Sequence, residues 1–165
     1  MYASAPCAER LTGMAASKAK SEAPLRARAL RMLARREYSR FELERRLTPF
    51  TEDPAEISEL LDDFERRGWL SESRVIEQVL ASRRRRFGAQ RIAHELREKG
   101  LSDAAIAGAQ MQLKEGELET ARAVWMKKFG VVPANARDKA RQMRFLQGRG
   151  FGLEVIRRLL RDIEE

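Results

Sequence analysis

The feature that most constrains this chain is a short pattern that occurs three times. In each copy an aromatic residue precedes Ser or Gly, and aliphatic residues follow four and eight positions after that small residue. The small residue suits a helix N-cap, and the aromatic residue before it can pack on the first aliphatic residue as a hydrophobic staple. The copies lie 49 and 64 residues apart, a period of the size that builds helical arrays. The predicted staples pair Tyr38 with Leu43, Phe87 with Ile92, and Phe151 with Ile156.

Glycines mark the ends of the predicted helices. Gly68 follows the apolar run that ends at Phe64, so we expect Gly68 in the left-handed conformation and Trp69 folded back on Phe64. Gly100 and Gly130 repeat this arrangement. The start and stop signals together predict helices at about residues 25–37, 39–48, 54–68, 72–86, 88–99, 103–114, 117–129, 134–148 and 152–164.

The composition favours an all-α, elongated array of about nine helices. The chain is 35% charged and contains few Gly and Pro, and no stretch alternates apolar and polar residues as a strand would. Ample surface around a thin core suits a stack of helices better than a sphere. The extra 15 residues before the third copy correspond to one helix, 117–129, which is consistent with helices grouped in threes with a shifted phase.

Other features indicate the compartment. The single cysteine cannot form an internal disulfide, and no run of 18 apolar residues could span a membrane. The N-terminus lacks the apolar segment of a signal peptide. We therefore expect a cytoplasmic protein, with residues 1–24 as a flexible tail.

The charge is unevenly distributed. The formal net charge is +8, yet segment 52–65 holds seven acidic residues and no basic one. Segment 83–97 holds six arginines against Glu95, and segment 122–149 holds eight basic residues against Asp138. Arginine, which outnumbers lysine 26 to 7, grips phosphate or carboxylate at two points, although a GC-rich coding sequence would produce the same ratio.

The basic residues supply the candidate contacts with a partner. Arg137, Arg141 and Arg144 form one stripe on a predicted helix, which favours an anionic partner over a merely solvated face. Arg84 and Arg85 close another helix, and there a solvated helix end and a partner contact remain equally open. The predicted basic contacts with protein or DNA are Arg84, Arg85, Arg91, Arg97, Lys127, Lys128, Arg137, Arg141, Arg144 and Arg149.

The sequence offers no support for catalysis. It contains neither a P-loop nor paired cysteine ligands, and the glycine-rich run 148–152 follows a predicted helix rather than a strand. The only histidine, His94, is expected on a polar helix face, with nothing to complete a metal site or a catalytic triad. We expect neither an enzyme nor a cofactor.

Specific motifs resemble the bacterial RecX regulatory proteins. They are Gly68-Trp69-Leu70-Ser71-Glu72-Ser73-Arg74, Phe87-Gly88 with Arg91-Ile92 and Glu95-Leu96, and Arg144-Phe145-Leu146 with Arg149-Gly150-Phe151. The resemblance covers about residues 25–163 in order. The chain departs from the family pattern at Trp69, Ser71 and Val75, where a Tyr, an Asp and an aromatic residue are usual, and these changes concern packing and capping.

This resemblance implies a fold and a function. RecX-like proteins are elongated, curved arrays of tandem three-helix repeats, here at roughly 25–70, 71–115 and 116–165. They bind in the groove of the RecA filament on single-stranded DNA, and they inhibit its ATPase, strand-exchange and coprotease activities. They thereby modulate recombination, DNA repair and the SOS response. We expect a monomer that binds naked DNA weakly. The alternatives are a nucleic-acid-binding helical module that acts without RecA, and an adaptor for another partner.

Overall fold

The computed structural model describes residues 24–164, and the predicted N-terminal tail lies outside them except for Pro24. Within this range the chain is all-α, with nine α-helices, one short 3₁₀ helix and no strand, so the predicted fold class is confirmed. Several helices end a few residues earlier than predicted. The helices are α1 (Leu25–Leu33), α2 (Arg40–Leu47), η1 (Thr48–Phe50), α3 (Pro54–Arg66), α4 (Glu72–Arg83), α5 (Ala89–Glu98), α6 (Asp103–Lys114), α7 (Glu117–Lys128), α8 (Ala136–Gly148) and α9 (Leu153–Glu164).

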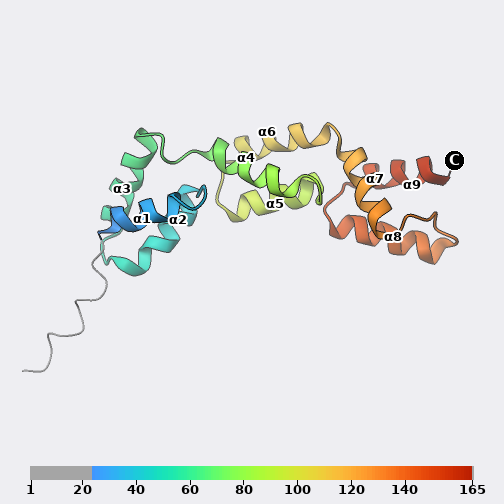
Figure 1. The fold of residues 1–165 in the computed structure, drawn as a ribbon, viewed down its shortest axis with the longest axis horizontal. Helices are drawn as coiled ribbons and strands as arrows, with labels where there is room; N and C mark the ends of the chain where they lie inside the picture. The colour runs from blue at the N-terminus through green and yellow to red at the C-terminus, as the bar shows by residue number, and fades with distance from the viewer. Residues whose placement is uncertain (1–23, 165) are drawn as a thin grey trace, which may run out of the picture.

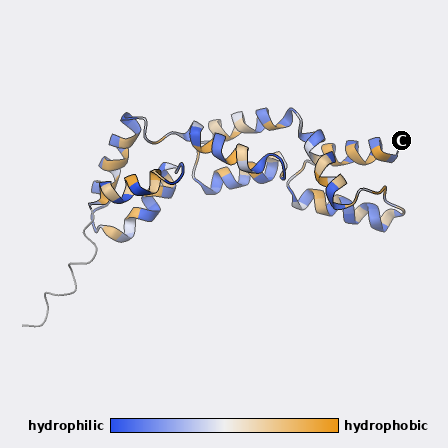
Figure 2. Ribbon diagram, in the orientation of Figure 1, coloured by the Kyte–Doolittle hydropathy of each residue, from blue (hydrophilic) through white to orange (hydrophobic). Residues whose placement is uncertain are grey.

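The helices form three modules that lie one after another along the long axis of the molecule (Figure 1). The first module contains α1–α3, the second α4–α6 and the third α7–α9, and each has its own buried hydrophobic cluster. Each helix carries both apolar and polar residues, as expected where a helix buries one side and exposes the other (Figure 2). Each core is small, so the molecule extends as a row rather than closing into a sphere.

The three aromatic residues of the repeated pattern have different surroundings. Tyr38 is buried in the first core with its staple partner, and Phe151 is buried in the third core with its own partner. Phe87 is only half-buried against the second core. The first two copies open the second helix of a module, whereas the third copy opens α9, the third helix of its module. This shift accounts for the longer spacing before the third copy.

The helix-end signals correspond to defined backbone turns. Gly68 has φ +68°, its amide donates to the Glu65 carbonyl, and the Trp69 amide donates to the Phe64 carbonyl at 2.8 Å. The Trp69 ring meets the Phe64 ring edge-on at 5.3 Å, as predicted. Gly100, with φ +71°, closes α5 in the same way. The predicted capping box of Ser39 is also present at the start of α2.

The modules are joined in the same way twice. The N-terminal end of α2 docks on the C-terminal end of α5, where the Ser39 hydroxyl donates to the Lys99 carbonyl and Lys99 Nζ pairs with Glu42 at 2.9 Å. The N-terminal end of α5 docks in turn on the C-terminal end of α8, where the Gly88 amide donates to the Arg149 carbonyl at 2.9 Å. Unsatisfied groups at helix ends are thereby paired across each joint.

Close backbone approach makes glycine necessary at the second joint. The Gln90 amide donates to the Gly150 carbonyl at 3.2 Å. A Cβ atom on Gly88 would collide with that carbonyl oxygen, and a Cβ atom on Gly150 would collide with the backbone amide of Arg91. The repeated pattern predicts only an N-cap at Gly88, and this second role in the joint does not follow from it.

Candidate interaction surface

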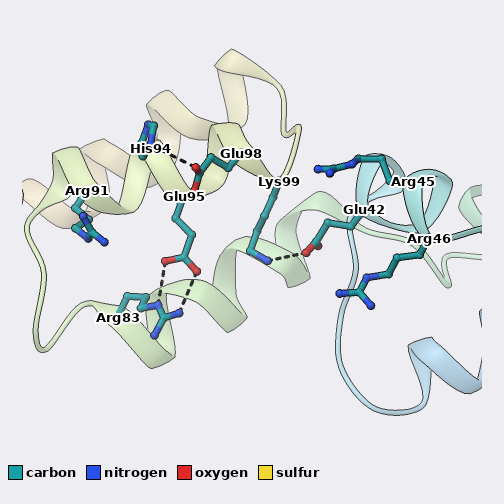
Figure 3. A pocket seen from close by; sticks show the side chains of 9 residues that line it. All are labelled: Glu42, Arg45, Arg46, Arg83, Arg91, His94, Glu95, Glu98 and Lys99. Atoms are coloured by element: carbon teal, nitrogen blue, oxygen red, sulfur yellow. Dashed lines mark hydrogen bonds and ion pairs between the residues drawn. The ribbon is translucent and has the colours of Figure 1, made fainter.

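A concave groove of about 620 Å³ opens between the first and second modules (Figure 3). Its walls come from α2 and from the ends of α4 and α5, so the joint between α2 and α5 determines its shape. The groove is lined by Glu42, Arg45, Arg46, Arg83, Arg91, His94, Glu95, Glu98 and Lys99.

Basic side chains of the protein itself already pair with the carboxylates of this groove. Glu42 accepts hydrogen bonds from Arg36 at 3.1 Å and from Lys99 at 2.9 Å. Burial opposes ionisation of Glu42, but these bonds outweigh it and hold the pKa of its carboxyl below the usual value. Arg83 binds both oxygens of Glu95, at 2.9 and 3.3 Å.

Three guanidinium groups in the groove have a different environment. Arg45, Arg46 and Arg91 pair with no carboxylate of residues 24–164 within 4.0 Å. Each lies near an aromatic ring, at 5.6 Å from Phe41 for Arg45, 5.4 Å from Tyr38 for Arg46 and 5.5 Å from Phe87 for Arg91. Figure 3 shows Arg45 and Arg46 on one side of the groove and Arg91 on the other.

This arrangement suits an anionic ligand. An aromatic ring supports a guanidinium group through cation–π attraction and leaves its N–H groups free to donate. Five cationic side chains face three carboxylates in the groove, so its net charge is positive with His94 neutral. The groove can therefore accept an anionic oxygen, such as a phosphate or a carboxylate, between two modules.

The other predicted basic contacts lie elsewhere on the molecule. Arg84 and Arg85 line a second hollow of about 310 Å³ beside the α6–α7 turn. Arg97, Lys127 and Lys128 are exposed on α5 and α7. The structure thus brings only Arg91 of the predicted set into the groove.

Helix α8 carries the rest of the predicted set. The predicted stripe Arg137, Arg141 and Arg144 is exposed, and Arg141 pairs with Asp138 at 3.3 Å. Arg149 is half-buried at the second joint, with its guanidinium 5.4 Å from the Phe87 ring and 5.2 Å from the Phe145 ring. The side chain of Arg149 therefore packs within the protein.

The charge pattern of the sequence did not single out Arg45 and Arg46. That pattern was a large excess of basic over acidic residues along a segment, and in α2 the excess is only one, because Glu42 and Glu44 stand among three arginines. In three dimensions Glu42 turns toward Lys99 and Arg36, which leaves Arg45 and Arg46 without a carboxylate partner among the described residues.

The acidic segment 52–65 offers a partner fewer unpaired carboxylates than its composition indicates. Asp63 pairs with Arg26 at 2.9 Å and with Arg67 at 2.8 Å, and hydrogen bonds from both hold the pKa of its carboxyl below the usual value. Arg40 pairs with Asp62 and Glu65. Arginines of the same module therefore neutralise three of its seven acidic side chains.

Residues 24–164 offer neither a membrane-spanning helix nor a metal site. None of their helices has both the length and the apolar character needed to cross a lipid bilayer. Between residues 24 and 164, no group of three or more His, Cys, Asp or Glu side chains has an arrangement that could hold a metal ion. His94 is exposed on α5 and lies 3.5 Å from Glu98.

Comparison with known proteins identifies the family. Models of the first, second and third three-helix domains of RecX match residues 26–64, 71–109 and 115–160, in that order. The chain belongs to the RecX family. The resemblance inferred from the sequence motifs is thereby confirmed.

Two relatives of similar sequence support this assignment. Regulatory protein RecX of Leptothrix cholodnii is 49% identical over 137 residues, which is 83% of this chain and 87% of that protein. Regulatory protein RecX of Chromobacterium violaceum is 43% identical and covers 82% of this chain and 88% of its own length. A crystal structure of RecX from Lactobacillus salivarius has the same fold, with a TM-score of 0.76 at 16% identity over 85% of this chain and 94% of that one.

Proposed function

We propose that this protein binds the RecA recombinase filament on single-stranded DNA and inhibits its ATPase, strand-exchange and coprotease activities. In this way it would modulate homologous recombination, DNA repair and the SOS response. We expect it to act as a cytoplasmic monomer. The observation that carries the proposal is the cationic groove between two modules of an elongated RecX-family array.

The shape and charge of the molecule support this function. An elongated array can contact several protomers of a repeating filament at once, because its modules are spaced along one axis. The groove arginines can grip phosphate or carboxylate oxygens on that filament. Inhibition then needs no chemistry beyond binding, since holding neighbouring protomers together obstructs the movements that accompany ATP hydrolysis.

An ATPase assay tests the proposal. RecA ATPase activity on single-stranded DNA should fall when this protein is added at sub-stoichiometric ratios. Binding to the assembled filament should be tighter than binding to naked single-stranded DNA. For the naked strand, three phosphate contacts predict a roughly 20-fold loss of affinity between about 50 and 200 mM salt. Equal or tighter binding to naked DNA, with unchanged ATPase activity, would instead indicate a nucleic-acid-binding module that acts without RecA.

Removing the charge of the three groove arginines should weaken filament binding by about 100-fold, because each loses about 1 kcal/mol of interaction with an anionic oxygen. The variant is Arg45→Gln, Arg46→Gln, Arg91→Gln, and its binding is measured by fluorescence anisotropy of the labelled protein as filament is added. The fold should persist, since these guanidinium groups pair with no carboxylate among residues 24–164.

A matched variant separates the groove from the stripe on α8. Arg137→Gln, Arg141→Gln, Arg144→Gln makes the same change in net charge on an exposed helix face. We expect a smaller loss of affinity that fades as salt rises, because exposed charges are screened over about 8 Å at physiological salt. If the groove variant binds the filament as tightly as the parent and the stripe variant does not bind, the binding site lies on α8 and not in the groove.

A further inference from the structure

An apolar surface is exposed at the turn between α7 and α8 in the third module. Met126, Val131 and Val132 are 58%, 67% and 50% exposed, and we call these three residues the apolar tip. The predicted helix-end contact between Met126 and Val131 does not bury either side chain. The tip is far from the groove described above, which lies between the first and second modules.

Buried contacts hold this turn in place. Gln142 is only 2% exposed, and its side-chain oxygen accepts a hydrogen bond from Trp125 Nε1 at 2.7 Å. Its amide nitrogen donates to the Val131 carbonyl at 3.2 Å. Phe129, just before the turn, meets Phe145 edge-on at 5.3 Å. The backbone that carries the apolar tip is thus anchored to the core, while its side chains face solvent.

Three exposed cationic residues lie close in sequence to the apolar tip. Lys127 and Lys128 follow Met126 directly, and Arg137 is the second residue of α8. All three are exposed, and none has a carboxylate partner within 4.0 Å in the described part of the chain. A partner that covers the tip would therefore gain both apolar contact and charge neutralisation.

We propose that the apolar tip is a docking site for an acidic protein segment that carries apolar side chains. This inference rests on the proposed function, in which the segment belongs to a protein subunit of the filament. The third module would then bind protein, while the groove between the first two modules binds anionic oxygens. The two sites lie on different modules, so each can be removed without the other.

The chemistry of the tip disfavours other occupants. A second copy of this chain carries the same net charge of +8 and the same cationic residues beside the tip, so the two would repel. Bases of single-stranded DNA stack on exposed aromatic rings, whereas the tip is aliphatic and the nearby Phe129 and Phe145 rings pack on each other. Three aliphatic side chains also provide little area for membrane insertion.

The double variant Val131→Ser, Val132→Ser tests this site. Binding of the full chain to the RecA filament on single-stranded DNA should weaken by about 10-fold or more, because two half-exposed valines lose their burial against the partner. The loss should persist at high salt, since apolar contact is not screened. Binding to naked single-stranded DNA should not change. Met111→Ser is the matched control, because Met111 is 71% exposed on α6 in the second module.

Each other outcome overturns the proposal in a distinguishable way. If the parent protein and the double variant bind the filament equally well, the tip is not a docking site, but the proposed function stands. If the parent protein does not bind the filament, both the proposed function and the docking site are refuted. If the parent protein binds vesicles that contain phosphatidylglycerol and the double variant does not, while both bind the filament equally, the tip is a membrane contact. A dimer in sedimentation that the variant converts to monomer would assign it to a second copy. Thermal unfolding of the variant must match the parent.

Discussion

Replacing Gly88 by alanine is expected to destabilise the protein by about 3 kcal/mol, at the upper end of what overpacking costs. The added Cβ atom would collide with the carbonyl group of Gly150 and the amide of Phe151, which are backbone groups and cannot rotate away. The Gly88 amide would also be pushed from the Arg149 carbonyl that it contacts at 2.9 Å. We expect the second and third modules to separate, which would appear as two thermal transitions in calorimetry.

Two other glycines provide matched controls for this substitution. Gly148 ends α8 near the same joint, but a Cβ atom there would meet nothing within 4 Å. Gly148→Ala should therefore be neutral or stabilise by up to about 1 kcal/mol, through helix propensity. Gly68 also has open space but has φ +68°, so Gly68→Ala measures the cost of left-handed backbone alone, about 1 kcal/mol. Equal stability of all three variants would show that the joint is not closely packed.

Phe151→Ala is expected to cost about 3–5 kcal/mol, because this side chain is 1% exposed and fills the third core. Phe87 occupies the equivalent place in the second copy of the repeated pattern, but it is only half-buried at the joint with the third module. Phe87→Ala should therefore cost about half as much. Urea denaturation of both variants measures the difference.

A larger cost at Phe87 than at Phe151 would contradict this account. The rings of Phe87 and Phe145 both lie near the guanidinium of Arg149. If Phe87 stabilises the joint through that contact, then Arg149→Ala should reproduce part of its effect. The sequence pattern alone predicts that all three aromatic residues are equally buried, so the comparison also tests what the pattern can determine.

The helices and the approximate positions of their starts and ends were predictable from sequence. Short-range rules govern helix starts and ends, since a cap, a staple or a left-handed glycine involves residues a few positions apart. Ser39 with Glu42 and Gly68 with Trp69 are examples. The all-α class and the family followed from the same local motifs, because these recur in order along most of the chain.

The groove was not predictable from sequence. Its walls come from α2 and α5, and its charge depends on Glu42 turning to Lys99, a residue 57 positions away. The charge excess along segment 83–97 did not separate Arg91, which lines the groove, from Arg84 and Arg85, which line another hollow.

The amino-acid sequence by itself determined the helices, their ends to within a few residues and their repetition, because these depend on neighbours along the chain. Only the tertiary structure decided how the modules join and which cations remain without partners. The joint between α5 and α8 depends on a close backbone approach that Gly88 and Gly150 permit, and no periodicity encodes it. Distant carboxylates likewise decide which arginines are neutralised, so the cationic groove exists only where two modules meet.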